Sequence, residues 1–119
     1  RFRVLEKAQQ LQIGRSTMAA FAIFGNDVTN AQLMQKYVKA AEPTLAPFGG
    51  KLLVPTIEHL ATGGEVVHLE GEFKPTRVVV IAFPNIERAQ AWYDSDEYQA
   101  IVNLRLEGSV GSGLIADGG

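Results

Sequence analysis

The chain has 119 residues, a size typical of a single domain, and its hydrophobic fraction of 46% and charged fraction of 20% are ordinary for a globular protein. The net charge is −2, and beyond a basic stretch at the start the body is acidic, which argues against a nucleic-acid-binding surface. There is no cysteine, so disulfides and thiolate chemistry are excluded, and no apolar run long enough to cross a membrane. We therefore expect a cytoplasmic protein with neither a nucleic-acid nor a membrane partner.

Residues 1–17 are basic and differ in character from the rest of the chain. Met18 stands directly before the first convincing strand, and we interpret it as the natural start, with residues 1–17 an N-terminal extension that is either introduced or disordered. One alternative is a helix, since its apolar side chains could share one face. Another is a targeting peptide, although the stretch lacks the continuous apolar core of a secretory signal. Residues 18–119 are expected to form one domain.

The first half of the body predicts a strand followed by a helix. Residues 19–25 form a short apolar run that ends in a Gly-Asn-Asp turn signal. Thr29 with Gln32 three residues later is a capping-box pattern, and apolar residues then follow at three- and four-residue spacings. Pro43 should interrupt that helix, and the glycine pair at 49–50 should end it.

The middle of the chain predicts edge structure and then the strongest strand. Residues 51–54 indicate a strand stopped by Pro55, and residues 65–69 are strand-like again, so the two are expected to form a hairpin or one interrupted edge structure. Residues 76–83 form an unbroken run rich in β-branched side chains. Such a run calls for burial on both faces and therefore for a central place in the sheet.

The last third predicts a pair of helices and a final strand. Asn85 is a cap for the first helix, and Ser95, followed by two acidic residues, indicates a fresh N-cap for a second helix that runs through Leu106. Residues 109–117 predict a last strand that two glycines weaken. The order βαββαβ predicts an α+β, ferredoxin-like fold, with a four-stranded antiparallel sheet and helices on one face.

Several strings of residues resemble a known bacterial family. The most specific is Trp92-Tyr93-Asp94-Ser95-Asp96-Glu97-Tyr98-Gln99, and weaker ones are Phe83-Pro84-Asn85, Tyr37, Phe48-Gly49-Gly50-Lys51 and Val67-His68-Leu69-Glu70-Gly71. Over residues 19–117 the chain resembles the domain of unknown function 1330 family, in the dimeric α/β-barrel superfamily. The resemblance implies a homodimer whose two sheets face each other, and it brings no function with it. Relatives in the superfamily include cofactor-free monooxygenases, isomerase-like enzymes and stress-response proteins.

The chain departs from the family pattern in two places. The segment at 55–62 is longer than is typical of the family and has no arginine, and the end of the chain has Gly-Ser-Gly where the family tends to have an arginine after glycine. An anionic ligand held by those arginines in relatives is therefore in question for this chain.

His68 and Glu70 are the candidate catalytic residues. In a strand they would point to one face of the sheet, where an imidazole that titrates near neutral pH beside a carboxylate suits general acid–base chemistry. The alternative is that His68 is partly exposed and that Glu70 bonds a neighbouring turn. Two isolated histidines and no cysteine give no metal-ligand spacing, so we expect neither a metal nor a cofactor.

The candidate ligand-binding residues are Tyr37, Trp92, Tyr93, Tyr98 and Arg105. The three aromatic residues around the predicted helix break either pack in the core or line a pocket between helices and sheet, where they would offer phenolic hydroxyls to a small ligand. Arg105 follows Tyr98 by two helical turns, so the two can share a face. There Arg105 would anchor a carboxylate or pair with a surface acid.

Three classes of function stay open, and whether the protein is an enzyme is one of the open points. We favour a dimeric protein that binds a small molecule between sheet and helices. The first alternative is a cofactor-independent isomerase or monooxygenase on a small oxygenated or aromatic compound, with His68 or Glu70 carrying the proton. The second alternative is a structural or regulatory dimer without a ligand.

Overall fold

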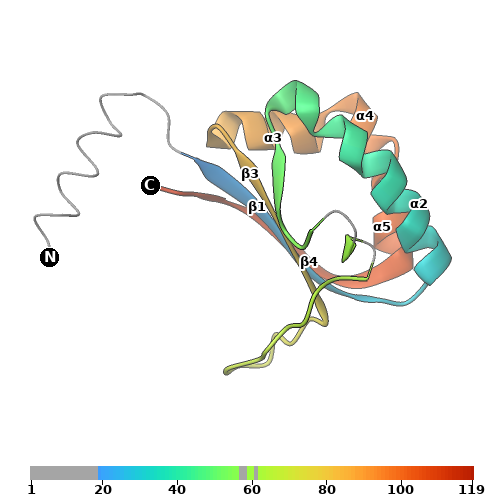
Figure 1. Ribbon diagram of the computed structural model, residues 1–119. Coiled ribbons are helices and arrows are strands. Elements are labelled where there is room, and N and C mark those ends of the chain that lie inside the picture. Colours follow the sequence, from blue (N-terminus) through green and yellow to red (C-terminus); the bar gives the residue numbers. More distant parts are fainter. Residues whose placement is uncertain (1–18, 57–58, 61) are drawn as a thin grey trace, which may run out of the picture.

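The computed structural model describes residues 19–56, 59–60 and 62–119, so the expectations for residues 1–17 lie outside the described residues. Four strands form one antiparallel sheet in the order β2-β3-β1-β4. They are β1 (Ala20–Val28), β2 (Lys51–Val54), β3 (Arg77–Phe83) and β4 (Ser109–Asp117). The helices cover one face of this sheet (Figure 1). The predicted ferredoxin-like α+β fold is confirmed, with β3 inside the sheet as its composition indicated.

The two central strands alternate between the helix-covered face and the open face. On β1 and β3 the buried side chains are Ala20, Ala22, Phe24, Val79, Ile81 and Phe83, all of which face the helices. The register places Phe24 opposite Val79, so both strands build one apolar floor under the helices. Strand β1 is longer than its apolar run predicted, because its last three residues still pair with the start of β4.

Helix α2 (Ala31–Ala41) starts one residue later than the capping-box pattern indicated. The N-cap is Asn30 rather than Thr29, because the Asn30 side chain accepts a hydrogen bond from the Leu33 N–H at 3.1 Å. The side chains of this helix that are buried against the sheet include Met34 and Tyr37.

The exit of α2 follows the expectation from Pro43. The helix ends before that proline, and the chain continues as two 3₁₀ turns, η1 (Glu42–Thr44) and η2 (Ala46–Phe48). Gly49 then turns the chain into β2 at a φ of +74°, a conformation that side-chain-bearing residues rarely adopt. Its close approach to Pro84 also leaves no room for a Cβ.

The second helical region is divided more finely than the sequence indicated. It consists of α3 (Ile86–Asp94), α4 (Asp96–Gln99) and α5 (Val102–Gly108). Ser95 caps α4 as predicted, since its hydroxyl accepts from the Tyr98 N–H at 3.2 Å. The single helix expected after Ser95 is wrong, because the backbone leaves helical geometry at Ile101. None of the helices in the described residues is long and apolar enough to span a membrane.

Residues 65–69 were expected to form a strand, and this is wrong. The sheet has two edge strands, β4 and β2, and the expected hairpin with residues 51–54 would use the outer edge of β2. That edge is four residues long and is irregular between Leu52 and Val54. The segment therefore pairs with no strand. It belongs to the long connection between β2 and β3, called the excursion below, which extends beyond the sheet (Figure 1).

Two contacts fix the return of this excursion to the sheet. The backbone N–H and the hydroxyl of Thr76 donate to the Asp27 carboxylate at 2.9 and 2.8 Å, and these hydrogen bonds lower the pKa of Asp27. The ring of Phe73 lies over Gly25, where a Cβ would come within 2.5 Å of it. The end of β1 is thereby tied to the start of β3.

The open face of the sheet is apolar across its width. Phe21 and Ile23 on β1 and Val78 and Val80 on β3 point to this side, since they alternate with the buried positions. The exposed large apolar side chains that extend it outward are Leu53, Val110 and Leu114. No helix among the described residues covers this face (Figure 1).

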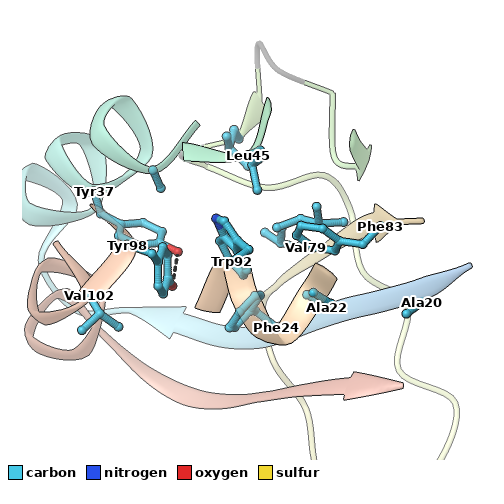
Figure 2. Packing of buried hydrophobic residues seen from close by; sticks show 14 of the residues in the cluster. Ala20, Ala22, Phe24, Tyr37, Leu45, Val79, Phe83, Trp92, Tyr98 and Val102 are labelled. Carbon is cyan, nitrogen blue, oxygen red and sulfur yellow. Dashed lines mark hydrogen bonds between the residues drawn. The ribbon is translucent and has the colours of Figure 1, made fainter. Parts of the chain in front are cut away.

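Trp92 stands at the centre of the core on the other side (Figure 2). Its ring centroid lies 4.3 Å from that of Tyr98 and 5.4 Å from that of Phe83, and its edge meets Phe24 at 6.2 Å. The indole N–H donates to the Thr44 hydroxyl at 2.9 Å. The core is therefore aromatic in its middle, with the one polar atom of the indole satisfied.

Candidate functional site

A small cavity lies between α2 and the sheet. Its volume is about 30 Å³, which gives room for about one or two water molecules or a small group of a ligand. Most of its wall is apolar, including Phe24, Leu45, Leu52, Leu60, Val79 and Ile81. The side chains with hydrogen-bonding or charged groups that line it are Tyr37, Glu42, Arg77, Trp92 and Arg105.

Two phenols meet beside this cavity. The hydroxyls of Tyr37, from α2, and Tyr98, from α4, are 2.7 Å apart, and the two rings pack edge to face at 6.2 Å (Figure 2). Arg105 Nε donates to the Tyr98 hydroxyl at 3.2 Å. Burial raises the pKa of Tyr37 well above its ordinary value, so this phenol stays protonated at neutral pH.

Arg105 places a positive charge inside the fold. Its side chain is 8% exposed, and its guanidinium carbon lies 4.9 Å from the centroid of the Phe24 ring, a cation–π contact. Burial by itself would lower the pKa of Arg105, but the neighbouring tyrosines outweigh burial and raise it. Among the described residues, the hydrogen bond from Nε to Tyr98 is the one that the structure gives this side chain.

Gly113 makes the position of Phe24 possible. A Cβ at Gly113 would come 2.5 Å from the Phe24 ring, so the glycine leaves the space that the ring occupies beside β4. Beside it runs a groove of about 420 Å³, whose lining includes Tyr93, Leu114 and Ile115. Phe24 and Arg105 line both the groove and the cavity, so these two side chains lie between the two spaces.

Arg77 is a second buried cation on the wall of the cavity. The side chain is 2% exposed, and burial lowers its pKa from the ordinary value. Its Nε and Nη2 donate to the backbone carbonyl of Leu60 at 3.0 and 2.7 Å, and Nη1 donates to Asn26 Oδ1 at 3.2 Å. This side chain therefore holds the excursion after β2 against the sheet.

A chain of hydrogen bonds connects the two arginines. Asn26, which accepts from Arg77, donates through Nδ2 to the Ser109 hydroxyl at 3.1 Å. Ser109 in turn donates to the backbone carbonyl of Arg105 at 2.7 Å. Strands β1, β3 and β4 each contribute one residue, so their register determines how the two guanidiniums are spaced.

The polar partners that the structure gives these guanidiniums are all neutral. They are two carbonyl or amide oxygens for Arg77 and one phenol for Arg105, within the described residues. Glu42, which lines the cavity, is exposed at its rim. Because unpaired buried charge is costly, an anion close to these two cations would stabilise them.

The structure brings most of the predicted ligand-binding residues together. Tyr37, Trp92 and Arg105 line the cavity. Tyr98 forms hydrogen bonds with Tyr37 and Arg105. Tyr93 lies apart from the cavity and lines the groove instead. The packing interpretation also holds in part, because Trp92 and Tyr98 are buried in the aromatic core.

His68 and Glu70 do not join this cluster. Both are exposed and neither lines the cavity or the groove. The expectation that a strand aims them to one face of the sheet is wrong, since the segment is irregular, and His68 Nε2 instead lies 2.8 Å from the Pro75 carbonyl. Their catalytic role stays a prediction. No group of three or more metal-ligating side chains occurs in the described part of the chain.

Arg77, Asn26 and Ser109 were not singled out from the sequence. Arg77 occupies the same alternation as Val79, Ile81 and Phe83, so period-two counting places it on the helix-facing side. An arginine at a core-facing position of a buried strand indicates a polar site, and this signal is visible in the sequence. Asn26 and Ser109 carried no such signal, because their partners lie far away in the chain.

The fold and the cavity define a ferredoxin-like α+β protein with two buried arginines under its first helix. The chain belongs to the domain of unknown function 1330 family (DUF1330), whose sequence pattern matches residues 19–119. The resemblance seen in the sequence is thereby confirmed. No functionally curated protein matches the chain.

Three solved structures are similar to this chain, each at 14% sequence identity. A protein of unknown function from Rhodopseudomonas palustris has a TM-score of 0.62, with 93% of this chain and 90% of that one covered. A candidate antibiotic biosynthesis monooxygenase from Nitrosomonas europaea has a TM-score of 0.48, with 85% and 89% covered. A conserved protein of unknown function from Bacteroides thetaiotaomicron, suggested to be an oxidoreductase, has a TM-score of 0.47, with 85% and 97% covered. At this identity the first of them shows a shared fold.

Proposed function

We propose that the protein binds a small anionic molecule, such as a carboxylate, at Arg105, which lines both the small cavity under α2 and the larger groove beside β4. The observation that carries this proposal is the pair of buried guanidiniums on one cavity wall, both bonded to neutral groups among the described residues. The three nitrogens of Arg77 already donate to protein oxygens, which makes Arg77 a source of positive potential. Arg105 has further N–H groups to offer, which makes it the anchor.

This proposal bears on the departures from the family pattern. The arginines that the family tends to carry near 55–62 and at the chain end are missing, but Arg77 and Arg105 supply charge from β3 and α5. The alternative of a cofactor-independent enzyme has less support, because neither His68 nor Glu70 lines the cavity.

Binding is tested by titrating the ¹⁵N-labelled protein with propionate and with its neutral isostere propionamide at constant ionic strength. We expect saturable shifts with propionate, largest around Arg105, and none with propionamide. Arg105→Met should weaken propionate binding by about tenfold or more, the value of one or two charge-assisted hydrogen bonds. Arg88→Met, which removes an exposed charge from α3, is the matched control and should bind as the wild type does. Equal responses to the acid and the amide would reject the proposal, and a protein that binds neither would favour the structural dimer.

We also propose that the open face of the sheet packs against the same face of a second copy. Monomeric proteins seldom expose a large contiguous apolar surface, and the face has charge of opposite sign at its two ends, with Lys51 on β2 level with the start of β1 and Asp27 near the end of β1. A two-fold axis that reverses the strands brings each Lys51 towards the partner's acidic end. A second copy of this chain therefore fits the face in apolar character and in charge.

The dimer is tested by light scattering on the size-exclusion eluate. Wild-type protein should have twice the mass of the chain, and Leu114→Glu on the open face should be monomeric, because each copy would bury an unpaired carboxylate. Leu106→Glu on α5 is the matched control, since Leu106 and Leu114 are 56% and 57% exposed. A monomeric wild type, or a dimer that survives Leu114→Glu, would contradict the proposal.

A further inference from the structure

The groove beside β4 has room for a whole small molecule. Its volume is about 420 Å³, against about 30 Å³ for the cavity under α2. Pockets of roughly 300–1,000 Å³ are the usual size for small-molecule ligands. Residues from four elements line the groove, among them Phe24 on β1, Tyr93 on α3, Arg105 on α5 and Ile115 on β4. The body of a ligand held by Arg105 therefore fits in the groove and not in the cavity.

The terminal nitrogens of Arg105 reach accessible space. Within residues 19–56, 59–60 and 62–119 the structure gives a hydrogen-bond partner to Nε but to neither Nη nitrogen. Across the same residues no fully buried side-chain nitrogen or oxygen lacks a partner, so neither Nη is fully buried. Each Nη carries two N–H donors, and a guanidinium can bind both oxygens of a carboxylate at once. Of the two spaces that Arg105 lines, the groove has the room for a carboxylate beside these donors.

An apolar wall lies next to this charge. The guanidinium carbon of Arg105 is 4.9 Å from the centroid of the Phe24 ring, which lines the groove. In the β1–β4 register Phe24 pairs with Gly113 and Ala22 with Ile115, so Phe24 and Ile115 lie on the same, helix-covered side of the sheet. Tyr93 adds a second ring from α3, and both Tyr93 and Ile115 are half-buried. The groove thus combines one cation with aromatic and aliphatic side chains.

We propose that the ligand of Arg105 is an amphipathic carboxylic acid, with an apolar body such as a phenyl ring. The carboxylate binds the Nη groups of Arg105, and the apolar body lies in the groove against Tyr93 and Ile115. This inference rests on the proposed function and names the ligand class of that site. Burial of the apolar body adds affinity that an acid of two or three carbons cannot obtain. The proposed dimer would use the opposite face of the sheet, so it leaves the groove to the ligand.

The proposal predicts an order among three probes. Phenylacetate carries both the charge and the ring, propionate carries the charge without the ring, and phenylacetamide carries the ring without the charge. Phenylacetate should therefore bind more tightly than either of the others. It should also shift the amide signals of Tyr93 and Ile115 together with those around Arg105, whereas propionate should shift those around Arg105 alone.

The test measures the dissociation constants of the three probes by the same ¹⁵N titration. In the wild type we expect phenylacetate to bind at least about tenfold more tightly than propionate, which corresponds to burial of about 55 Å² of apolar surface. In Ile115→Ser this preference should fall about threefold or more, while the propionate constant stays within about twofold. Ile86→Ser is the matched control, because Ile86 is also half-buried against the core but does not line the groove, and it should keep the wild-type preference.

The outcomes separate this inference from the proposed function. If the wild type binds phenylacetate no more tightly than propionate, the inference is overturned and anion binding stands; this comparison needs no variant and does not depend on how Ile115→Ser folds. A preference that a folded Ile115→Ser protein keeps in full also overturns it, because the ring then lies elsewhere. If neither acid binds, or if phenylacetamide binds as tightly as phenylacetate, the proposed function fails and the inference fails with it.

Discussion

Replacing Trp92 by alanine is expected to cause the largest loss of stability in this protein, about 3–5 kcal/mol in the free energy of unfolding. The side chain is 1% exposed and stands between Phe24, Phe83 and Tyr98, so its removal leaves a void that aromatic rings cannot easily refill. It also removes the donor that satisfies Thr44. Urea unfolding followed by circular dichroism measures the effect.

The control for Trp92→Ala is Leu106→Ala. Leu106 is a large apolar side chain on α5 that stays exposed, so its truncation should change the free energy of unfolding by about 0.5 kcal/mol or less. A loss below about 1 kcal/mol for Trp92→Ala would show that the aromatic cluster does not form the centre of the core.

Replacing Arg77 by alanine is expected to destabilise the fold by about 2–4 kcal/mol, because it leaves the buried Leu60 carbonyl and Asn26 amide oxygen without their donor. Removing an unpaired buried cation returns part of its desolvation cost, which keeps the loss below the sum of three charged hydrogen bonds. Arg77→Met, which restores the volume but none of the bonds, should lie between the wild type and Arg77→Ala.

Amide exchange adds a second readout for Arg77. The Gly63 N–H donates to the His59 carbonyl at 2.6 Å, in the segment that Arg77 holds against the sheet. Its exchange should accelerate in Arg77→Ala more than the exchange of amides in β1, because the segment loses its attachment before the sheet unfolds. Arg88→Ala, on the exposed side of α3, should change neither measurement. An Arg77→Ala protein as stable as the wild type would contradict the tethering role.

The local patterns that predicted elements correctly are those whose cause lies within a few residues. Ser95 caps α4 because its hydroxyl reaches a backbone N–H three residues on, and Pro43 ends α2 because it has no N–H to donate. Where two neighbouring residues suit the same role, the sequence pattern predicted the wrong one. Thr29 and Asn30 both suit an N-cap, and the backbone of β1, which runs on to Val28, decided in favour of Asn30.

The strand expected at residues 65–69 is absent for a different reason. Their composition suits a strand, but a strand needs a neighbour with free backbone groups, and the expected hairpin partner β2 offers only a short, irregular edge. The assignment of His68 and Glu70 to one sheet face depended on that strand, and it is wrong because the strand does not form.

The contacts of the candidate site also differ in how far apart their residues lie in the sequence. The pairing of Tyr98 with Arg105 was predicted from their seven-residue spacing, and the contact forms although the helix between them is broken at Ile101. The meeting of Tyr37 with Tyr98, and of Arg77 with Asn26, joins residues 61 and 51 positions apart. Spacing along the chain contains no information on such contacts.

The sequence by itself determined the ferredoxin-like order of elements and the family, because alternation, helical periodicity and capping are short-range properties of the chain. Only the tertiary structure decided that two arginines line one small cavity and that the hydroxyls of Tyr37 and Tyr98 meet beside it. The register of β3 and β4 on β1 brings together side chains that hydrogen bonding then orients. A buried charge is recognisable as a binding site once its partners are known, and those partners come from distant segments of the chain.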